Sequence, residues 1–476
     1  MWENCFRKML VSLLAAFLIL AFYGNIVTLV QGANPSEWWN SDWRYRIPIR
    51  IEEKSGNNLT DYQICVTIDT ASLISAGKMQ TNCSDIRFTD SANNELSYWI
   101  ESGKNTNDTK IWIKIPKIQA NKEVTIYMYY GNPLASAISN GNTTFDFFDD
   151  FSGNKLDTSK WNVSDVGAVV TVANDELHLS GDGSVEVGGI QSKLTFEPNV
   201  SVEAFIKVNH NPTWDSREYW FFSENSYYGS TRAYQTSSSG AQNDENGYLS
   251  VYSNGVGSNY DLGQIDDQDI RRSLHWTKDK VELFWNGSLK LTVTSNIPTT
   301  PMRLILLCEG QSYPDALVVP WIFVRKYISP EPTYTLGSEE KFLDFSVPWE
   351  GQTYHVTVMS NSTLEDFNFS QPEMHIRFNV SGLSGTVGYC NVTIPKSLLK
   401  GEPWTVKING VDWSFIPSEN ATHSFIYFTY THASTLQVII QGTWAIPEFS
   451  STMILLFLMS LTSLAIALTK KTRKIT

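Results

Sequence analysis

Aromatic, acidic and amide side chains gather between residues 214 and 234 of the sequence. Aromatic rings stack on the C–H faces of sugars, and planar polar side chains hydrogen-bond the sugar hydroxyls. The mixture therefore predicts a carbohydrate-binding site made by Trp214, Asp215, Glu218, Asn225, Tyr227, Tyr228 and Tyr234. In the alternative interpretation, residues 219–222 are a core strand and the tyrosines are loop side chains without a ligand.

Three aspartates near residue 150 have the oxygen ligands that calcium prefers. Asp149, Asp150 and Asp157 could hold a structural calcium ion, or they could cap turns through backbone N–H groups. No other cofactor is expected. The seven histidines form neither a His-Glu-x-x-His motif nor a His-x-His pair, which argues against a local zinc site.

Four cysteines follow the N-terminal region. Cys65 and Cys83 lie 18 residues apart in one expected domain, so they are the candidate disulfide pair. Buried free thiols are the alternative.

Both ends of the chain carry apolar runs. Residues 1–32 combine Arg7 and Lys8, an apolar stretch and small exit residues, which predicts a signal peptide or an uncleaved signal anchor. Residues 449–469 are long enough for a transmembrane helix, and the basic tail 470–476 marks the cytoplasmic side. The sequence thus predicts a single-pass cell-membrane protein with an extracellular ectodomain.

Glycosylation sequons are frequent, as expected for a surface glycoprotein. They begin at Asn58, Asn82, Asn107, Asn142, Asn162, Asn199, Asn286, Asn361, Asn368, Asn379, Asn391 and Asn420. The alternative is that they reflect only an Asn- and Thr-rich composition.

The composition favours a β-rich acidic protein. Aromatic residues make up 13% of the chain and the net charge is −13, which argues against a nucleic-acid partner. Short β-branched and aromatic runs separated by Gly, Asn, Asp and Ser predict an all-β fold of consecutive β-sandwich or jelly-roll domains. Linker-like segments place three domains at 37–140, 141–336 and 340–444.

The first domain carries a distinctive series of short motifs. Trp43-Arg-Tyr-Arg46 opens it and Tyr129-Tyr-Gly-Asn132 closes it. The series resembles a domain-of-unknown-function family that opens many archaeal and bacterial secreted surface proteins. That resemblance implies a β-sandwich without established catalysis, whose tryptophans and tyrosines are core residues or a sugar-stacking face.

The second domain opens on Phe147-Phe-Asp-Asp-Phe151 and closes on Trp321-Ile-Phe-Val-Arg-Lys-Tyr327. These ends resemble concanavalin A-like, laminin-G-type jelly rolls. The resemblance implies that the first and last strands lie together in one sheet and that ligands bind a concave face. The Glu-x-Asp-x-x-Glu motif of laminarinase-type relatives is absent, so a glycosidase is not the primary expectation.

Residues 388–399 resemble a membrane-proximal module of archaeal surface proteins. Pro447, Glu448 and Phe449 resemble the sorting signal read by archaeal sortase-like enzymes, with a plain membrane anchor as the alternative.

The sequence thus predicts a surface-anchored, non-enzymatic protein. Its expected partners are a glycan or cell-envelope polysaccharide, bound by the jelly roll, and the membrane, reached through the C-terminal helix. A structural spacer of the cell envelope and an unrecognised glycoside hydrolase or lyase are the alternatives.

Overall fold

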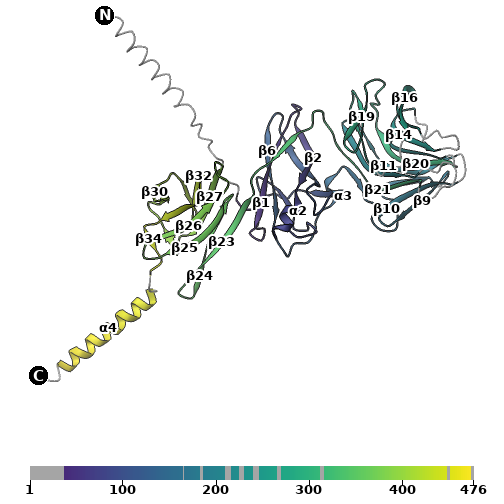
Figure 1. The fold of residues 1–476 in the computed structure, drawn as a ribbon. Helices are drawn as coiled ribbons and strands as arrows, with labels where there is room; N and C mark the ends of the chain where they lie inside the picture. The colour runs from purple at the N-terminus through teal and green to yellow at the C-terminus, as the bar shows by residue number, and fades with distance from the viewer. Residues whose placement is uncertain are drawn as a thin grey trace, which may run out of the picture. The chain divides into compact units, whose positions relative to one another are not determined.

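The computed structural model describes residues 37–164, 166–182, 186–209, 216–224, 230–239, 246–264, 270–310, 316–447 and 451–472. The chain divides into two compact units (Figure 1). Residues 42–339 form one, and among the described residues 37–41 join those from 340 onward in the other. Antiparallel strands dominate both, so the described part of the chain is all-β, as predicted. The predicted signal segment 1–32 lies outside the described residues.

The larger unit begins with a β-sandwich. One sheet has the order β3-β6-β1-β22 and the other β2-β5-β4. Alternation places Ile49 and Ile51 of β1 and Ile111 and Ile113 of β5 in a shared apolar core. Its elements are β1 (Tyr45–Glu52), β2 (Leu59–Ile68), α2 (Thr70–Ser75), β3 (Arg87–Asp90), β4 (Tyr98–Ser102), β5 (Thr109–Ile118), β6 (Glu123–Tyr130) and β22 (Thr333–Leu336).

A two-sheet jelly roll follows in the same unit, after the short helix α3 (Gly141–Thr144). The eight-stranded sheet has the order β19-β18-β17-β12-β21-β10-β9, with β7 also paired to β21. The seven-stranded sheet has the order β16-β15-β14-β13-β20-β11-β8. The strands are β7 (Phe147–Asp149), β8 (Trp161–Ser164), β9 (Ala168–Ala173), β10 (Glu176–Gly181), β11 (Val187–Phe196), β12 (Val200–Val208), β13 (Ser216–Ser223), β14 (Arg232–Ser239), β15 (Asn246–Ser253), β16 (Val256–Gln264), β17 (Ile270–Trp276), β18 (Val281–Trp285), β19 (Ser288–Val293), β20 (Met302–Gly310) and β21 (Leu317–Lys326).

The first and last strands of the jelly roll lie side by side. Phe148 of β7 stands opposite Phe323 of β21, as the resemblance to concanavalin A-like folds implies. The next segment leaves the jelly roll, because β22 pairs with β1 of the first sandwich. The predicted range of the second domain, 141–336, included residues 333–336, and the structure places them in a sheet of the first sandwich.

The smaller unit contains a third sandwich. One sheet has the order β23-β24-β27-β32-β31 and the other β25-β26-β33-β29-β30, with Val358 and Ile440 among the core residues between them. The strands are β23 (Glu340–Trp349), β24 (Gln352–Ser360), β25 (Thr363–Ser370), β26 (His375–Ser381), β27 (Val387–Pro395), β28 (Leu399–Lys400), β29 (Thr405–Ile408), β30 (Val411–Asp412), β31 (Ile416–Glu419), β32 (His423–Thr431), β33 (Leu436–Gln441) and β34 (Trp444–Ala445).

The C-terminal segment forms the helix α4 (Ser451–Thr472). Across the described residues, no helix combines the length and apolar character needed to cross a membrane. This finding contradicts the predicted transmembrane helix and single-pass membrane localisation, and corrects both. The expectation rested on the apolar composition of residues 449–469. Of the three residues of the expected sorting signal, Pro447 is described, and Glu448 and Phe449 lie outside the described residues.

The sequon asparagines differ in exposure. Three are partly buried, Asn361, Asn379 and Asn391. The others are exposed: Asn58, Asn82, Asn107, Asn142, Asn162, Asn199, Asn286, Asn368 and Asn420. Glycosylation of these side chains stays a prediction.

Candidate functional site

The residues predicted to bind a sugar belong to β13, β14 and the segments beside them. Trp214 and Asp215 immediately precede β13 in the chain, and Asn225, Tyr227 and Tyr228 follow it; all five lie outside the described residues. β13 has eight residues, so it spans roughly 23 Å at about 3.3 Å per residue. The two groups therefore join the strand at its opposite ends.

Glu218 lies in the middle of β13 and is fully buried. It stands opposite Cys308, a core residue, so its side chain is on the face of the sheet that packs inside the sandwich. Burial raises the pKa of the Cys308 thiol well above its usual value, and the neighbouring Glu218 carboxylate raises it further. This interior position does not fit the predicted surface contact with a sugar.

Tyr234, the remaining predicted residue, lies on the outer face of the same sheet. Its ring meets that of Tyr219 edge to face, with centroids 5.7 Å apart. Both rings pack with Ile305 and Leu307 of β20 in a cluster separate from the sandwich core. Tyr234 is only 4% exposed, so much of this cluster is covered.

The outer face continues over β15 with more accessible side chains. Arg232 stands opposite Tyr252 in the register, and its guanidinium lies 3.8 Å from the centroid of the Tyr252 ring. Tyr248 lies on the same face, because it stands opposite Thr236, two residues beyond Tyr234. We call Tyr219, Tyr234, Tyr248, Tyr252 and Arg232 the tyrosine face. The sequence prediction missed all of these except Tyr234, although alternation along residues 246–253 places Tyr248 and Tyr252 on one side.

Polar side chains border the tyrosine face. On β15, the Ser250 hydroxyl donates to Asn259 Oδ1 at 2.8 Å. On β20, Glu309 forms an ion pair with Arg217 at 3.2 Å, and the Glu309 side chain is 14% exposed. The face thus offers aromatic rings with hydroxyl, amide, guanidinium and carboxylate groups around them.

Asp149 and Asp157, two of the three aspartates considered as calcium ligands, accept local hydrogen bonds. Asp149 accepts hydrogen bonds from Trp161 Nε1 at 2.7 Å and from the Phe151 amide at 2.9 Å. Asp157 accepts from the Ser159 amide at 2.9 Å. No group of three potential metal ligands occurs among the described residues, which include all three aspartates. These contacts are those expected for the turn-capping alternative, and calcium binding stays a prediction.

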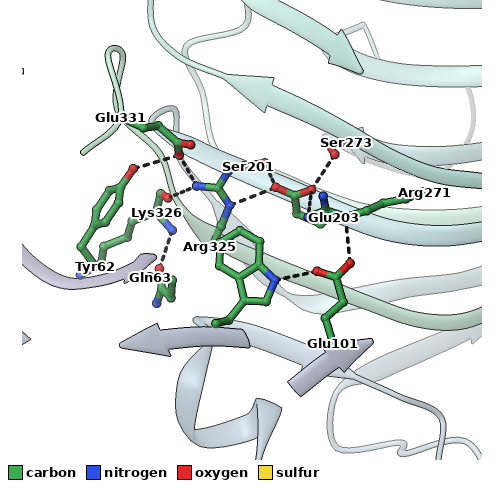
Figure 2. A network of polar contacts seen from close by, with 11 residues as sticks. Tyr62, Gln63, Glu101, Ser201, Glu203, Arg271, Ser273, Arg325, Lys326 and Glu331 are labelled. Carbon is green, nitrogen blue, oxygen red and sulfur yellow. Dashed lines mark hydrogen bonds and ion pairs between the residues drawn. The ribbon is translucent and has the colours of Figure 1, made fainter. Parts of the chain in front are cut away.

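A network of buried charges lies where the first sandwich meets the jelly roll (Figure 2). Arg271 Nη2 contacts Glu203 at 2.9 Å, and Arg271 Nε lies 3.3 Å from Glu101 of the first sandwich. Arg325 Nε donates to Glu203 at 3.0 Å, and its Nη1 pairs with Glu331. The Glu203 and Glu101 side chains are 2% and 4% exposed.

The two central carboxyl groups of this network have opposite pKa shifts. Burial raises the pKa of Glu101. Burial also opposes ionisation of Glu203, but the guanidinium groups of Arg271 and Arg325 outweigh it and lower that pKa to about 2. Divergent pKa values are typical of acid–base pairs in enzymes. Because both carboxylates are buried and bridged by one arginine, we interpret them as an interdomain contact.

The network borders a pocket of about 370 Å³ lined by Tyr62, Cys65, Trp112 and Glu331. Burial raises the pKa of the Cys65 thiol to about 12, so Cys65 is not a thiolate nucleophile at neutral pH.

Cys65 and Cys83 do not form the predicted disulfide, because both are free thiols. Cys65 belongs to β2 and lies beside the charge network. Cys83 lies near Thr70 and Asn105, where burial raises the pKa of its thiol. Spacing along the chain suggested the pair, but the fold places the two thiols in different surroundings.

One family model matches part of the chain. Residues 82–164 match the domain of unknown function DUF2341. The match extends from the first sandwich across α3 into β8 of the jelly roll. Among proteins with curated descriptions, none matches this chain.

Several solved structures are similar to part of the chain. One is a β-glucanase of Bacillus licheniformis, 17% identical, covering 38% of this chain and 97% of its own, with a TM-score of 0.30. An endo-β-1,3-glucanase of Pyrococcus furiosus is 16% identical, with 39% and 95% covered and a TM-score of 0.30. A pseudo β-1,3-glucanase of Mycobacterium tuberculosis is 16% identical, with 39% and 99% covered and a TM-score of 0.30.

Identities of this size bear on the fold and do not establish an activity for this chain. The prediction that the protein is not an enzyme is withdrawn: the similar structures include named glucanases, which establish no activity for this chain. That prediction rested on missing local motifs, and catalytic groups can come from strands far apart in the sequence.

Proposed function

We propose that this protein interacts with carbohydrate through the outer face of the seven-stranded sheet of its jelly roll. The observation that carries the proposal is the tyrosine face on β13, β14 and β15, in which Tyr248 and Tyr252 are partly exposed whereas Tyr219 and Tyr234 are buried. The outer face of a sandwich sheet is ordinarily polar and solvated, so gathered aromatic rings on it need a further reason.

The chemistry of this face fits a sugar. Tyrosine rings offer flat apolar surfaces for the C–H groups of a pyranose, and their hydroxyls exchange hydrogen bonds with its hydroxyls. Ser250 and Asn259 are already joined beside the rings and add further polar groups. Trp214 and Tyr228, which precede and follow β13 in the chain, stay predicted sugar contacts outside the described residues.

The experiment is a titration of the full chain with neutral oligosaccharides, comparing wild type with Tyr252→Ala. We expect truncation of Tyr252 to weaken binding by about 1–2 kcal/mol, roughly tenfold, because it removes a stacking ring. Trp214→Ala and Tyr228→Ala are tested in the same way. Trp444→Ala, which removes a 40% exposed ring in the other unit, is the matched control. Saturable binding that Tyr252→Ala leaves unchanged would reject the tyrosine face, and no binding by a folded chain would favour a structural role.

Hydrolysis of the glycan is the second candidate function, and Glu309 is the observation that favours it. Its partly accessible carboxylate lies on β20, on the same face as the tyrosines. Glycosidases need two carboxyl groups about 5–9.5 Å apart, so Glu309 would need a partner. Reducing-end release that is lost in Glu309→Gln, while binding persists, would support an enzyme. Release unchanged in Glu309→Gln would exclude Glu309 from the reaction.

A further inference from the structure

The smaller unit carries an open groove, and none of the residues that line it belongs to the jelly roll. It has a volume of about 860 Å³, and residues 37–41 form one wall against the sheet of β23, β24, β27, β31 and β32. Trp38 fixes this wall by packing on Phe342 with ring centroids 5.6 Å apart. The volume lies within the ~300–1,000 Å³ typical of small-molecule sites.

Strand alternation explains how the groove floor arises. Val392 and Ile426 point into the sandwich core. Their neighbours Asn391 and Phe425 therefore point to the other side and line the groove, as does Tyr427. Phe425 and Tyr427 are each partly exposed. The floor is thus an outward sheet face that carries aromatic rings and amides.

The lining indicates the class of ligand. Among its described residues, the groove contains no lysine or arginine and one carboxylate, Glu37. Phosphate and other anions are bound chiefly through lysine and arginine side chains, which this lining lacks, although it includes His423. Aromatic rings with amide and hydroxyl groups between them instead suit a neutral polyol, which needs flat apolar contacts and hydrogen bonds together.

One buried polar atom in the groove lining also points to a ligand. Asn391 Oδ1 is buried and has no hydrogen-bond partner in the structure. An acceptor in that state is unfavourable, and a native protein generally satisfies it. A hydroxyl of a bound ligand, after a small rotation of the amide, would supply the missing donor.

We propose that this groove binds a neutral oligosaccharide, with pyranose rings stacked on Tyr427 and Trp39 and a hydroxyl donating to Asn391. The inference stands independently of the proposed jelly-roll site. It gives the protein a second carbohydrate site, in a different unit of the chain.

The test is calorimetric titration of the full chain, produced without N-glycosylation because Asn391 and Asn420 are sequons. The probes are cellohexaose, laminarihexaose and mannohexaose, with a sulfated hexasaccharide as the anionic comparison. We expect Tyr427→Ala and Trp39→Ala each to weaken binding of one neutral probe about tenfold. Tyr427→Phe keeps the ring and should bind within about twofold of wild type, and the control Trp444→Ala should not change affinity.

The jelly-roll variant Tyr252→Ala separates the two proposals. Groove binding that survives Tyr252→Ala and is lost in Tyr427→Ala supports the inference. Binding lost only in Tyr252→Ala supports the jelly-roll site and overturns the groove. Preference for the sulfated probe, or self-association that Trp39→Ala abolishes, would also overturn it. Thermal unfolding of each variant, together with Tyr427→Phe, excludes a mere folding defect as the cause of lost affinity.

Discussion

His275 shows how the packing of one residue creates a pH dependence. Its ring lies between Phe284 and Tyr327, with centroids 4.4 and 4.1 Å away. Its Nδ1 is buried without a hydrogen-bond partner. Burial, helped by the charge of Arg325, lowers the pKa of His275 from 6.5 to about 3. The folded protein therefore keeps this imidazole neutral in mildly acidic solution.

We predict that this histidine destabilises the protein as the pH falls. Below pH 6.5 the His275 imidazole binds a proton in the unfolded chain, whereas in the folded protein it stays neutral down to about pH 3. Allowing for its partial exposure, the cost at pH 4.5 is about 1–2 kcal/mol. His275→Gln should flatten the fall in unfolding free energy between pH 6.5 and 4.5, measured with urea. His178→Gln is the control, and equal slopes in both variants and wild type would contradict the assignment.

The buried charge network carries a second prediction at this scale. Arg325 contacts Glu203, Glu331 and the face of Trp112. Arg325→Met leaves Glu203 buried with one guanidinium fewer, so it should cost about 3–5 kcal/mol of unfolding free energy. A loss below 1 kcal/mol would show that the network is solvated or rearranges.

Glu203 makes the stability contributed by the same network depend on pH in acid. Its folded pKa is about 2 against 4.5 in the unfolded chain, so its contribution is fully present above pH 4.5. That contribution is lost as the pH falls from 4.5 towards 2. Glu203→Gln should remove this part of the acid transition, measured by near-UV circular dichroism. Burial raises the pKa of Glu101, so Glu101 titrates above this pH range. The variant Glu101→Gln is therefore the comparison for the acid transition.

Individual residues were the part that the sequence predicted least well. Residue types predicted a sugar site around Tyr234, which stays a prediction, and they could not reveal that Glu218 points inward. That orientation depends on which side of β13 packs against the other sheet. Glu101, Glu203 and Arg325 belong to distant strands, and no local pattern indicates that they meet.

At the scale of elements, β21 performs two tasks on its two faces. Ile322 and Val324 point into the core of the jelly roll. Phe323 points the other way and packs with Trp99 and Phe145, stacking on Phe145 with centroids 3.9 Å apart. Alternation along one strand therefore builds both a domain core and the contact with the neighbouring sandwich.

This arrangement predicts different effects for adjacent substitutions. Phe323→Ala should cost about 3–5 kcal/mol and separate the unfolding of the two sandwiches, because it empties the aromatic contact between them. Val324→Ala should lower the melting temperature of the jelly roll while the two sandwiches still unfold together. Differential scanning calorimetry distinguishes the outcomes by one transition or two. A single transition in Phe323→Ala would mean that the charge network alone couples the sandwiches.

Short strands were predictable because alternating and β-branched runs are local signals. Residues 45–51, 111–115 and 281–285 all lie in strands, as expected. β22 was not predictable as part of the first sandwich, because its partner β1 lies almost 300 residues earlier in the chain. Pairing between segments so far apart depends on tertiary packing, which neither the proline content nor the spacing of residues 330–336 indicates.

At the scale of the whole molecule, residues 42–339 form the unit within which the two sandwiches share structure. The aromatic cluster around Phe323, the charge network and the pairing of β22 with β1 all join them. Residues 141–336, made alone, would expose Trp321 and Phe323, leave Arg271 without Glu101, and leave β22 without a partner strand.

We therefore predict that residues 42–339 unfold in one cooperative transition, with calorimetric and van't Hoff enthalpies in agreement. Residues 141–336 should melt at lower temperature, because the interface is removed although the jelly-roll core is complete. The full chain should add a separate transition for the smaller unit, which has its own core. Equal melting temperatures for 42–339 and 141–336 would mean that the interface contributes little. Ligand screens could then use the isolated jelly roll. If residues 141–336 melt at the lower temperature that we predict, the screens should use residues 42–339 or the full chain.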